Sequence, residues 1–354
     1  MRIFDYSKLR ERTWDNEILA YVAGIHEFKG KQELFLRQKP VELNRLTEIA
    51  KVQSTESSNR IEGIITTNAR LKQLVADKTT PRNRDEEEIL GYRNVLNIVH
   101  ESYDAIPVRS SYILQLHGEL LKYTTFSYGG KFKTTPNEID MMLKTGEKVV
   151  LFKPLEPYET PDAVERLCEE YNRAINEEIV DPLILIPNFI LDFLCIHPFN
   201  DGNGRMSRLL TLLLLYRSGY HVGQYISIEK AIADTKDDYY AALQQADRDW
   251  MNDNNDPKPF IKYMLGIILS CYKDFEARLT IASKAGRRST AYDVVKTYVN
   301  STLGKFSKQD ALASCPNLGS SSVESALKKL VEEGAVIRTG AGRKTMYLKN
   351  PCLK

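Results

Sequence analysis

A short polar stretch between two apolar runs carries most of the residues that could do chemistry. Residues 197–208 have the sequence His-Pro-Phe-Asn-Asp-Gly-Asn-Gly-Arg-Met-Ser-Arg and lie between the apolar runs 189–196 and 209–216. The stretch holds the imidazole of His197, the carboxylate of Asp201 and two guanidinium groups. An imidazole can accept a proton near neutral pH, and guanidinium groups bind phosphate oxygens. Together these residue types indicate a site that handles a phosphorylated substrate.

The glycine-rich turn within this stretch predicts an anion site. Gly202 and Gly204 flank Asn203 just before an expected helix, so backbone amides and the positive helix N-terminus would face phosphate oxygens. Arg205 and Arg208 are three residues apart in the first helical turn and share one face. Basic residues at a helix N-terminus oppose its dipole, and a bound anion would explain their placement.

Three further residues each have a functional and a structural interpretation. Asp201 is either a helix N-cap or a ligand of Mg²⁺, which prefers one or two carboxylates together with phosphate oxygens. His197 is either a general base or a structural histidine. Glu62 ends a predicted helix, where the dipole disfavours an acid, so it is either a solvated surface residue or the partner of a basic residue. Ser58 lies one turn earlier on the same face.

The elements that must position these residues are mainly helical. Apolar periodicity and helix start and stop signals predict helices at residues 41–62, 69–76, 84–101, 109–123, 162–178, 187–196, 204–219, 236–248 and 259–279. Residues 137–143 and 148–152, with a turn at 144–147, predict a β-hairpin. Its free edge could take an extended peptide by strand addition, although a hairpin that only packs on helices is the alternative.

The C-terminal part of the chain has a different pattern. Residues 283–290 are short, basic and polar, which indicates a linker. Three short helices followed by strands at 336–339 and 345–348 predict a winged helix-turn-helix domain over residues 291–354. On its recognition helix two lysines stand against three glutamates, so DNA binding is expected to be weak and docking of a protein is the alternative.

The bulk composition excludes several classes of protein. The 354 residues carry a net charge of +2, so no overall field favours nucleic acid or a membrane surface. No apolar run approaches the length of a membrane span, and the chain does not open with a secretory signal. The five cysteines are scattered without metal-ligand spacing. These features predict a cytoplasmic protein without a membrane partner, and apolar residues of the N-terminal arm and of the helices are candidates for a homodimer interface.

The stretch 197–208 resembles the Fic-domain signature, HPFx(D/E)GNGRxxR, at every position. The resemblance extends over roughly residues 100–270, and residues 58–63 resemble the family's inhibitory motif, (S/T)xxxE(G/N). It implies a mainly α fold: a Fic-type helical bundle with a β-hairpin flap, followed by a small winged helix-turn-helix domain. The expected segments are an N-terminal arm with inhibitory helix at 1–67, a catalytic core at 68–282, the linker at 283–290 and the last domain at 291–354.

The resemblance implies a protein adenylyltransferase, which moves AMP from ATP to a Ser, Thr or Tyr hydroxyl of a target protein or of itself. In that interpretation His197 is the base and Asp201 holds Mg²⁺ on the phosphates. The flap at residues 137–152 would register the target segment. The nucleotide would be bound by Gly202, Asn203, Gly204, Arg205, Arg208, Tyr239 and Tyr240, although tyrosines in a helix can also be plain core residues.

Inhibition would follow from a contact between Glu62 and Arg208, with Ser58 steadying the Glu62 carboxylate. Two other functions compete with this interpretation. The chain could be a winged-helix DNA-binding regulator whose Fic core only senses nucleotide, or Glu62 could position water and remove AMP from modified targets.

Overall fold

The computed structural model describes residues 2–38, 40–142, 148–285, 290–302, 304–315, 318–340, 342 and 345–350. The expected turn at 144–147 and part of the expected linker, residues 286–289, lie outside the described residues. Contacts divide the chain into two compact units, Met1–Lys29 with Ala50–Cys271 and Gly30–Ile49 with Tyr272–Lys354. These boundaries differ from the expected breaks near residues 67 and 283. The reason is that α2 (Asn16–Gln38), α3 (Pro40–Ile61) and α12 (Lys258–Ala285) each contribute residues to both units.

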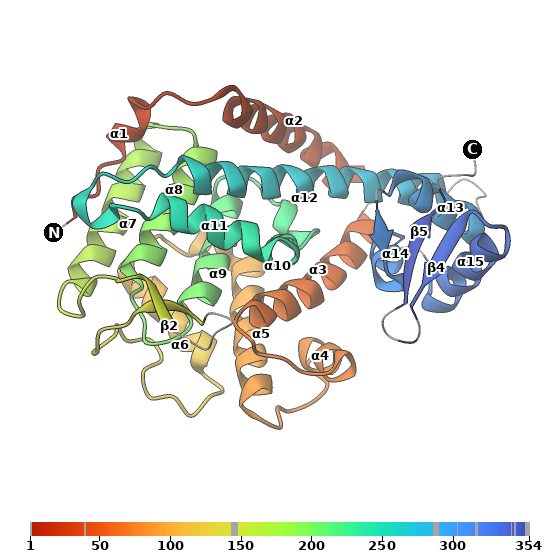
Figure 1. Ribbon diagram of the computed structural model, residues 1–354, viewed down its shortest axis with the longest axis horizontal. Helices are drawn as coiled ribbons and strands as arrows, with labels where there is room; N and C mark the ends of the chain where they lie inside the picture. Colours follow the sequence, from red (N-terminus) through yellow and green to blue (C-terminus); the bar gives the residue numbers. More distant parts are fainter. Residues whose placement is uncertain are drawn as a thin grey trace. The chain divides into compact units, whose positions relative to one another are not determined.

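The first unit is a helical bundle (Figure 1), and its centre is formed by α8 (Pro182–Ile196) and α9 (Asn203–Arg217), which pack on each other. The α8 helix also packs on α7 (Thr160–Asn176). The α5 helix (Arg84–Ser102) packs on α4 (Asn68–Val75), α6 (Ser110–Leu121) and α9. Three single-turn 3₁₀ helices occur at Tyr103–Ala105, Val222–Gln224 and Trp250–Asn252. The remaining helices of this unit are α1 (Ser7–Arg10), α10 (Ile228–Asp234) and α11 (Lys236–Ala246).

The two central helices are buried because they are apolar on every side. Every residue of α8 from Leu183 to Ile196 is buried, and the leucines of α9 are likewise hidden from solvent. The expected start of α8 at Pro187 is wrong by five residues. Asp181 accepts a hydrogen bond from the Leu183 amide and caps the helix, and Pro182 suits its first position, so Pro187 lies inside it.

The first unit also contains a β-hairpin. Strands β1 (Ile139–Met142) and β2 (Lys148–Phe152) pair antiparallel, with Ile139 opposite Phe152 and Met142 opposite Lys148. The hairpin predicted from the sequence is therefore confirmed. Together the two strands form a two-stranded sheet, so this part of the fold has edges available for pairing.

Besides its parts of α2, α3 and α12, the second unit has three further helices and a small sheet. It contains α13 (Ala291–Ser301), α14 (Lys308–Ser314) and α15 (Ser320–Glu332), and the sheet has the antiparallel order β3-β5-β4. The strands are β3 (Lys305–Phe306), which the sequence pattern missed, β4 (Val336–Thr339) and β5 (Met346–Lys349). Capping boxes at Thr290 and Ser307 start α13 and α14. That these elements form a winged helix remains a prediction.

Residues 283–285 of the expected linker are helical, because α12 continues to Ala285, the residue before the first glycine of this segment.

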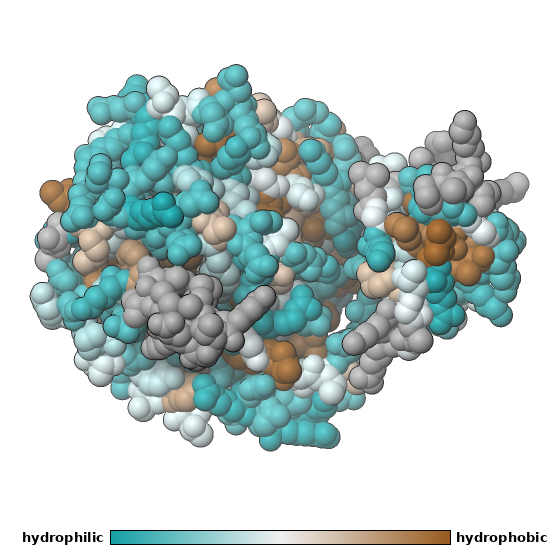
Figure 2. Space-filling model, in the orientation of Figure 1, coloured by the Kyte–Doolittle hydropathy of each residue, from teal (hydrophilic) through white to brown (hydrophobic). Residues whose placement is uncertain are grey.

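The face drawn in Figure 2 is largely hydrophilic, as expected when the large apolar side chains fill the interior. Within the described part of the chain, no helix combines the length and the apolar character that crossing a membrane requires.

Gly91 provides a test of the packing between α5 and α6. A Cβ atom at this position would overlap the backbone carbonyl of Leu120, so Gly91→Ala must push the helices apart. We expect a loss of roughly 1–3 kcal/mol in the free energy of unfolding, measured by denaturant titration. Gly30→Ala is the matched control, because Gly30 is an exposed residue of α2 with open space around it. That change should stabilise the protein by about 0.5–1 kcal/mol, and equal effects of the two substitutions would contradict the packing argument.

Candidate functional site

A pocket of about 750 Å³ in the first unit collects most of the predicted site residues. Its walls come from the end of α3, the loop between α8 and α9, the hairpin and α11. The predicted residues that line it are Glu62, His197, Asp201, Gly202, Asn203, Gly204, Arg208, Tyr239 and Tyr240. Ser58 and Arg205 are not part of this lining.

His197 stands at the C-terminal end of α8 in a left-handed backbone conformation, with φ of 51° and ψ of 62°. This conformation turns the chain sharply out of the helix and into the glycine-rich loop. The Nδ1 atom lies 3.3 Å from the carbonyl oxygen of Leu194. Because a carbonyl can only accept, Nδ1 carries the proton and Nε2 is left to accept one. Burial lowers the pKa of His197 to about 4, so the ring is neutral at pH 7.

The loop after His197 is shaped by its own side chains. Gly202 has a φ of 84°, which a residue with a side chain rarely adopts, and it is the N-cap of α9. Asn203 uses its amide group to hold Phe199, accepting from the Phe199 N–H at 2.9 Å and donating to its carbonyl at 2.8 Å. The amide side chain therefore closes the loop, and the backbone N–H groups of the first turn of α9 remain as the expected phosphate donors.

Arg208 is buried on α9 and is held by the last turn of α3. Its Nη2 atom lies 2.7 Å from Oε1 of Glu62 and donates to the backbone carbonyl of Ser58 at 2.9 Å. The Nε atom donates to the Ser58 hydroxyl at 2.7 Å. The predicted contact between Glu62 and Arg208 is thus present. The prediction that Ser58 steadies the Glu62 carboxylate is wrong, because its hydroxyl holds Arg208 instead.

The Glu62 carboxylate also occupies space at the start of α9. A Cβ atom added at Gly204 would overlap Oε1 of Glu62, so the carboxylate lies directly against the first turn of the helix. The positive end of the helix favours an anion at this place. In this structure that anion is the carboxylate of Glu62.

Arg205 differs from the sequence-based expectation. Its guanidinium is 1% exposed and faces Glu88, with Nη1 2.6 Å from the Glu88 carboxylate and Nη2 3.3 Å from that of Asp201. It therefore packs beneath the loop and not on the pocket wall. Burying an Arg at a helix N-terminus is tolerable here because these two carboxylates neutralise its charge. A direct contact of Arg205 with nucleotide remains a prediction that this conformation does not display.

Asp201 suits Mg²⁺ better than it suits helix capping. The N-cap of α9 is Gly202, which makes the cap interpretation of Asp201 wrong. Its side chain is 38% exposed and lines the pocket, with Oδ1 accepting from the Gly202 amide at 2.6 Å. The described residues hold no group of three or more His, Cys, Asp or Glu that would bind a metal ion alone. One accessible carboxylate beside the backbone amides of the first turn of α9 is compatible with Mg²⁺, which prefers one or two carboxylates together with phosphate oxygens, and that Asp201 holds this ion remains a prediction.

The two tyrosines of α11 have different environments. Tyr239 is 4% exposed and packs edge-to-face against Phe260 and Tyr263, which is the environment of a core residue. Tyr240 is 39% exposed, and both tyrosines are among the residues that line the pocket. Lys236, which the sequence analysis did not single out, donates from Nζ to the carbonyl of Ile61 at 2.8 Å and so ties α11 to the last turn of α3.

Three other residues missed by the sequence analysis hold the loop from behind. His117 of α6 stacks on Phe199 with ring centres 3.7 Å apart, accepts from the Gly130 amide through Nδ1 and donates from Nε2 to the Asp201 carbonyl. Lys133 donates to the carbonyl of Ile196 at 3.1 Å, and Asn137 donates to the carbonyls of His197 and Phe199. No motif marks these residues, and only the folded chain brings them to the loop.

His117 should make stability depend on pH. Burial lowers its pKa to about 4 in the folded state, against 6.5 for an unperturbed histidine. Between these values the unfolded state binds more protons, so the free energy of unfolding falls as pH drops from 6.5 to 4. Gln places an amide near the position of Nε2 and does not titrate. We therefore expect His117→Gln to show a shallower loss of stability across this window in urea titrations, by an amount on the order of 3 kcal/mol at pH 4. If the free energy of unfolding falls equally with pH in the wild type and in His117→Gln, the lowered pKa of His117 would be contradicted.

Comparison with known proteins relates this site to a family. Residues 107–215 match the model of the Fic/DOC family. A protein adenylyltransferase Fic from Drosophila simulans is 26% identical over 250 residues, which is 69% of this chain and 43% of that protein. The protein adenylyltransferase fic-1 of Caenorhabditis elegans is 25% identical over 186 residues and 51% of this chain. The chain spans only 32% of the length of that relative.

Solved structures agree on the fold. A Fic family protein from Desulfovibrio desulfuricans G20 superposes with a TM-score of 0.63 over 97% of this chain and 98% of that one, at 20% identity. A Fic domain containing signaling protein from Bacteroides thetaiotaomicron VPI-5482 covers 71% of this chain and 95% of its own, with a TM-score of 0.60 and 26% identity. Residues 107–215, which include α8, α9 and the loop that carries His197, therefore contain a Fic domain, and the chain has the fold of these Fic family structures.

Proposed function

We propose that this protein is an autoinhibited protein adenylyltransferase, which transfers AMP from ATP to hydroxyl groups of target proteins and of itself. The observation that carries the proposal is the position of Glu62. Its carboxylate binds Arg208 and lies on the first turn of α9, inside the same pocket as His197 and Asp201. Relatives named protein adenylyltransferase support the type of reaction.

The reaction needs a hydroxyl oxygen, a phosphorus atom and a base in one geometry. The target hydroxyl attacks the α-phosphorus of ATP, the bond to the β-phosphate oxygen breaks, and pyrophosphate leaves. His197, neutral at pH 7, takes the hydroxyl proton on Nε2. The backbone of residues 202–204 and the guanidinium of Arg208 would bind the phosphates. Catalysis then consists largely of positioning and charge neutralisation.

The family implies Mg²⁺, and Asp201 is the residue that would hold it. A bound Mg²⁺ ion would neutralise charge on the phosphate oxygens. The chain contributes the orientation of the carboxylate, because Oδ1 accepts from the Gly202 amide and Oδ2 lies beside Arg205. Arg205 is in turn held by Glu88, which also accepts from Arg84 at 2.8 Å.

Inhibition follows from competition for one cation. A productive triphosphate needs Arg208, and in this conformation the guanidinium is taken by Glu62 and Ser58. ATP can still enter a pocket of about 750 Å³. Its phosphates would settle beside the Glu62 carboxylate, with the α-phosphorus out of line for attack.

Replacing Glu62 tests the inhibition. Glu62→Gly frees Arg208 without removing a phosphate ligand, so self-modification with labelled ATP should rise on the order of 10²-fold. Ser58→Ala removes one hydrogen bond to Arg208 and should raise the rate less. Arg208→Ala should be inactive with or without Glu62. Glu56→Gly is the matched control, since it changes an acid of the same helix that pairs with Arg60 on the surface.

A rate for Glu62→Gly equal to that of the wild type, with the fold intact, would show that Glu62 does not inhibit. Labelling that stays at background in every variant would favour a DNA-binding regulator that senses nucleotide. If the wild type releases AMP from a previously labelled protein, this would favour the function in which Glu62 positions water to remove AMP from modified targets.

His197→Ala tests the base in the activated Glu62→Gly protein. Loss of a general base should slow transfer by roughly 10²–10⁴-fold while ATP binding, measured by calorimetry, changes little. Because burial lowers the pKa of His197 to about 4, activity of the His197-containing protein should hold from pH 7 to 5 and fall only near pH 4. An acid limb near pH 6.5 would show that the base titrates as a solvated histidine.

A further inference from the structure

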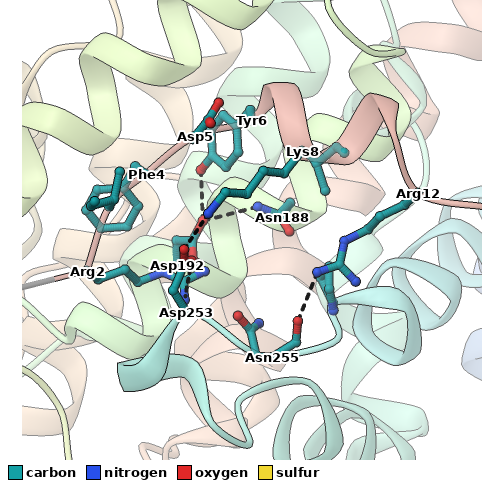
Figure 3. A pocket seen from close by; sticks show the side chains of 13 residues that line it. Arg2, Phe4, Asp5, Tyr6, Lys8, Arg12, Asn188, Asp192, Asp253 and Asn255 are labelled. Atoms are coloured by element: carbon teal, nitrogen blue, oxygen red, sulfur yellow. Dashed lines mark hydrogen bonds and ion pairs between the residues drawn. The ribbon is translucent and has the colours of Figure 1, made fainter.

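A cluster of side chains outside the pocket joins the N-terminal segment to α8 (Figure 3). Its centre is Asp192, one turn before the end of α8, with a side chain only 1% exposed. Four groups donate to this carboxylate: Arg2 Nη2 at 3.2 Å, the Tyr6 hydroxyl at 3.0 Å, Asn188 Nδ2 at 3.1 Å and Trp250 Nε1 at 2.7 Å. A buried carboxylate of this kind requires a counter-charge, and Arg2 supplies it.

Arg2 also holds Trp250 directly. Its Nη1 atom donates to the Trp250 carbonyl at 2.6 Å, and its guanidinium carbon lies 4.6 Å from the centre of the indole ring. Trp250 is fully buried between these partners. The space left inside the cluster is only about 50 Å³, which is too small for a ligand. The cluster therefore fixes the position of an indole ring.

The indole ring of Trp250 contacts the hairpin. Trp250 packs edge-to-face on Phe152, with ring centres 6.2 Å apart and planes at 72°. Phe152 is the last residue of β2, pairs with Ile139 of β1, and lines the candidate active-site pocket. The contacts Asp192–Arg2–Trp250–Phe152 thus run from the N-terminal segment to the wall of that pocket.

We infer that Trp250, locked by Arg2 and Asp192, is a positioning residue for the β1–β2 hairpin. A two-stranded hairpin alone is only marginally stable in water, so its orientation depends on contacts outside the sheet. Phe152 on Trp250 is such a contact, at the end of β2 that meets the pocket. The inference rests on the proposed function in one respect: the hairpin is the surface that registers the acceptor segment opposite the α-phosphorus.

Hydrogen exchange of the full chain, followed by mass spectrometry, tests the positioning directly. Arg2→Ala should loosen Trp250 and raise exchange of the β2 amides roughly 2- to 10-fold, the range that corresponds to the loss of one edge-to-face aromatic pair. Amides of α9 should exchange as in the wild type. Arg12→Ala is the matched control, because Arg12 belongs to the same segment and pairs with exposed Asp256 at 3.1 Å. It should leave β2 unchanged.

Phe152→Leu provides a second variant that leaves the buried ion pair intact. It should raise β2 exchange to a similar extent, and Arg2→Ala added to Phe152→Leu should have little further effect. Unchanged β2 exchange in Arg2→Ala would overturn the inference. Equal increases in β2 and α9, or additive effects of the two substitutions on β2, would also overturn it.

An activity measurement separates this inference from the proposed function. In the Glu62→Gly background, Arg2→Ala should slow labelling of the protein itself several-fold while the ATP concentration for half-maximal rate stays the same. Faster exchange in β2 without any labelling in the Glu62→Gly background would leave the positioning of the hairpin intact and refute the adenylyltransferase. Labelling of the Glu62→Gly protein, together with unchanged β2 exchange in Arg2→Ala, would support the adenylyltransferase and refute the positioning of the hairpin.

Discussion

Arg208 carries a positive charge that burial has removed from water, and the first unit is built to compensate it. The guanidinium is held by groups 146 and 150 residues earlier in the chain, the Glu62 carboxylate and both oxygens of Ser58. An unpaired charge at this depth would be strongly destabilising. The last turn of α3 and the first turns of α9 are therefore kept together by one cation, and an anion that replaces Glu62 has to meet the same need.

This arrangement explains two placements that are unfavourable when taken alone. An acid at the end of α3 and basic residues at the start of α9 both oppose the local helix dipoles. In the folded protein Glu62 sits against the positive end of α9, and Arg208 faces the negative end of α3. Arg205 is neutralised by Glu88 and Asp201. Each of these charges is therefore compensated by an opposite charge or a helix dipole that lies outside its own helix.

The loop between α8 and α9 depends on support from segments that carry no recognisable motif. Two residues in left-handed conformations, His197 and Gly202, redirect the chain within six residues. Such a loop keeps its shape only when the surrounding structure determines it. That structure is provided by His117, Lys133 and Asn137, which bond the carbonyl groups of the loop. His197 is therefore positioned by α6 and by the segment that leads into the hairpin.

The sequence by itself determined the helical class, the hairpin, the central buried helices and the residues of the loop from His197 to Arg208. These features follow from local periodicity, turn residues and a contiguous motif, all of which lie within short windows of the chain. The tertiary structure decided which way the side chains face. It directs Arg205 toward Glu88 and away from the pocket. It makes Ser58 a hydrogen-bond partner of Arg208. It also places Arg2 against Trp250, which lies 248 residues later in the chain. Such pairings depend on the packing of distant helices and on the compensation of buried charge, which no local pattern encodes.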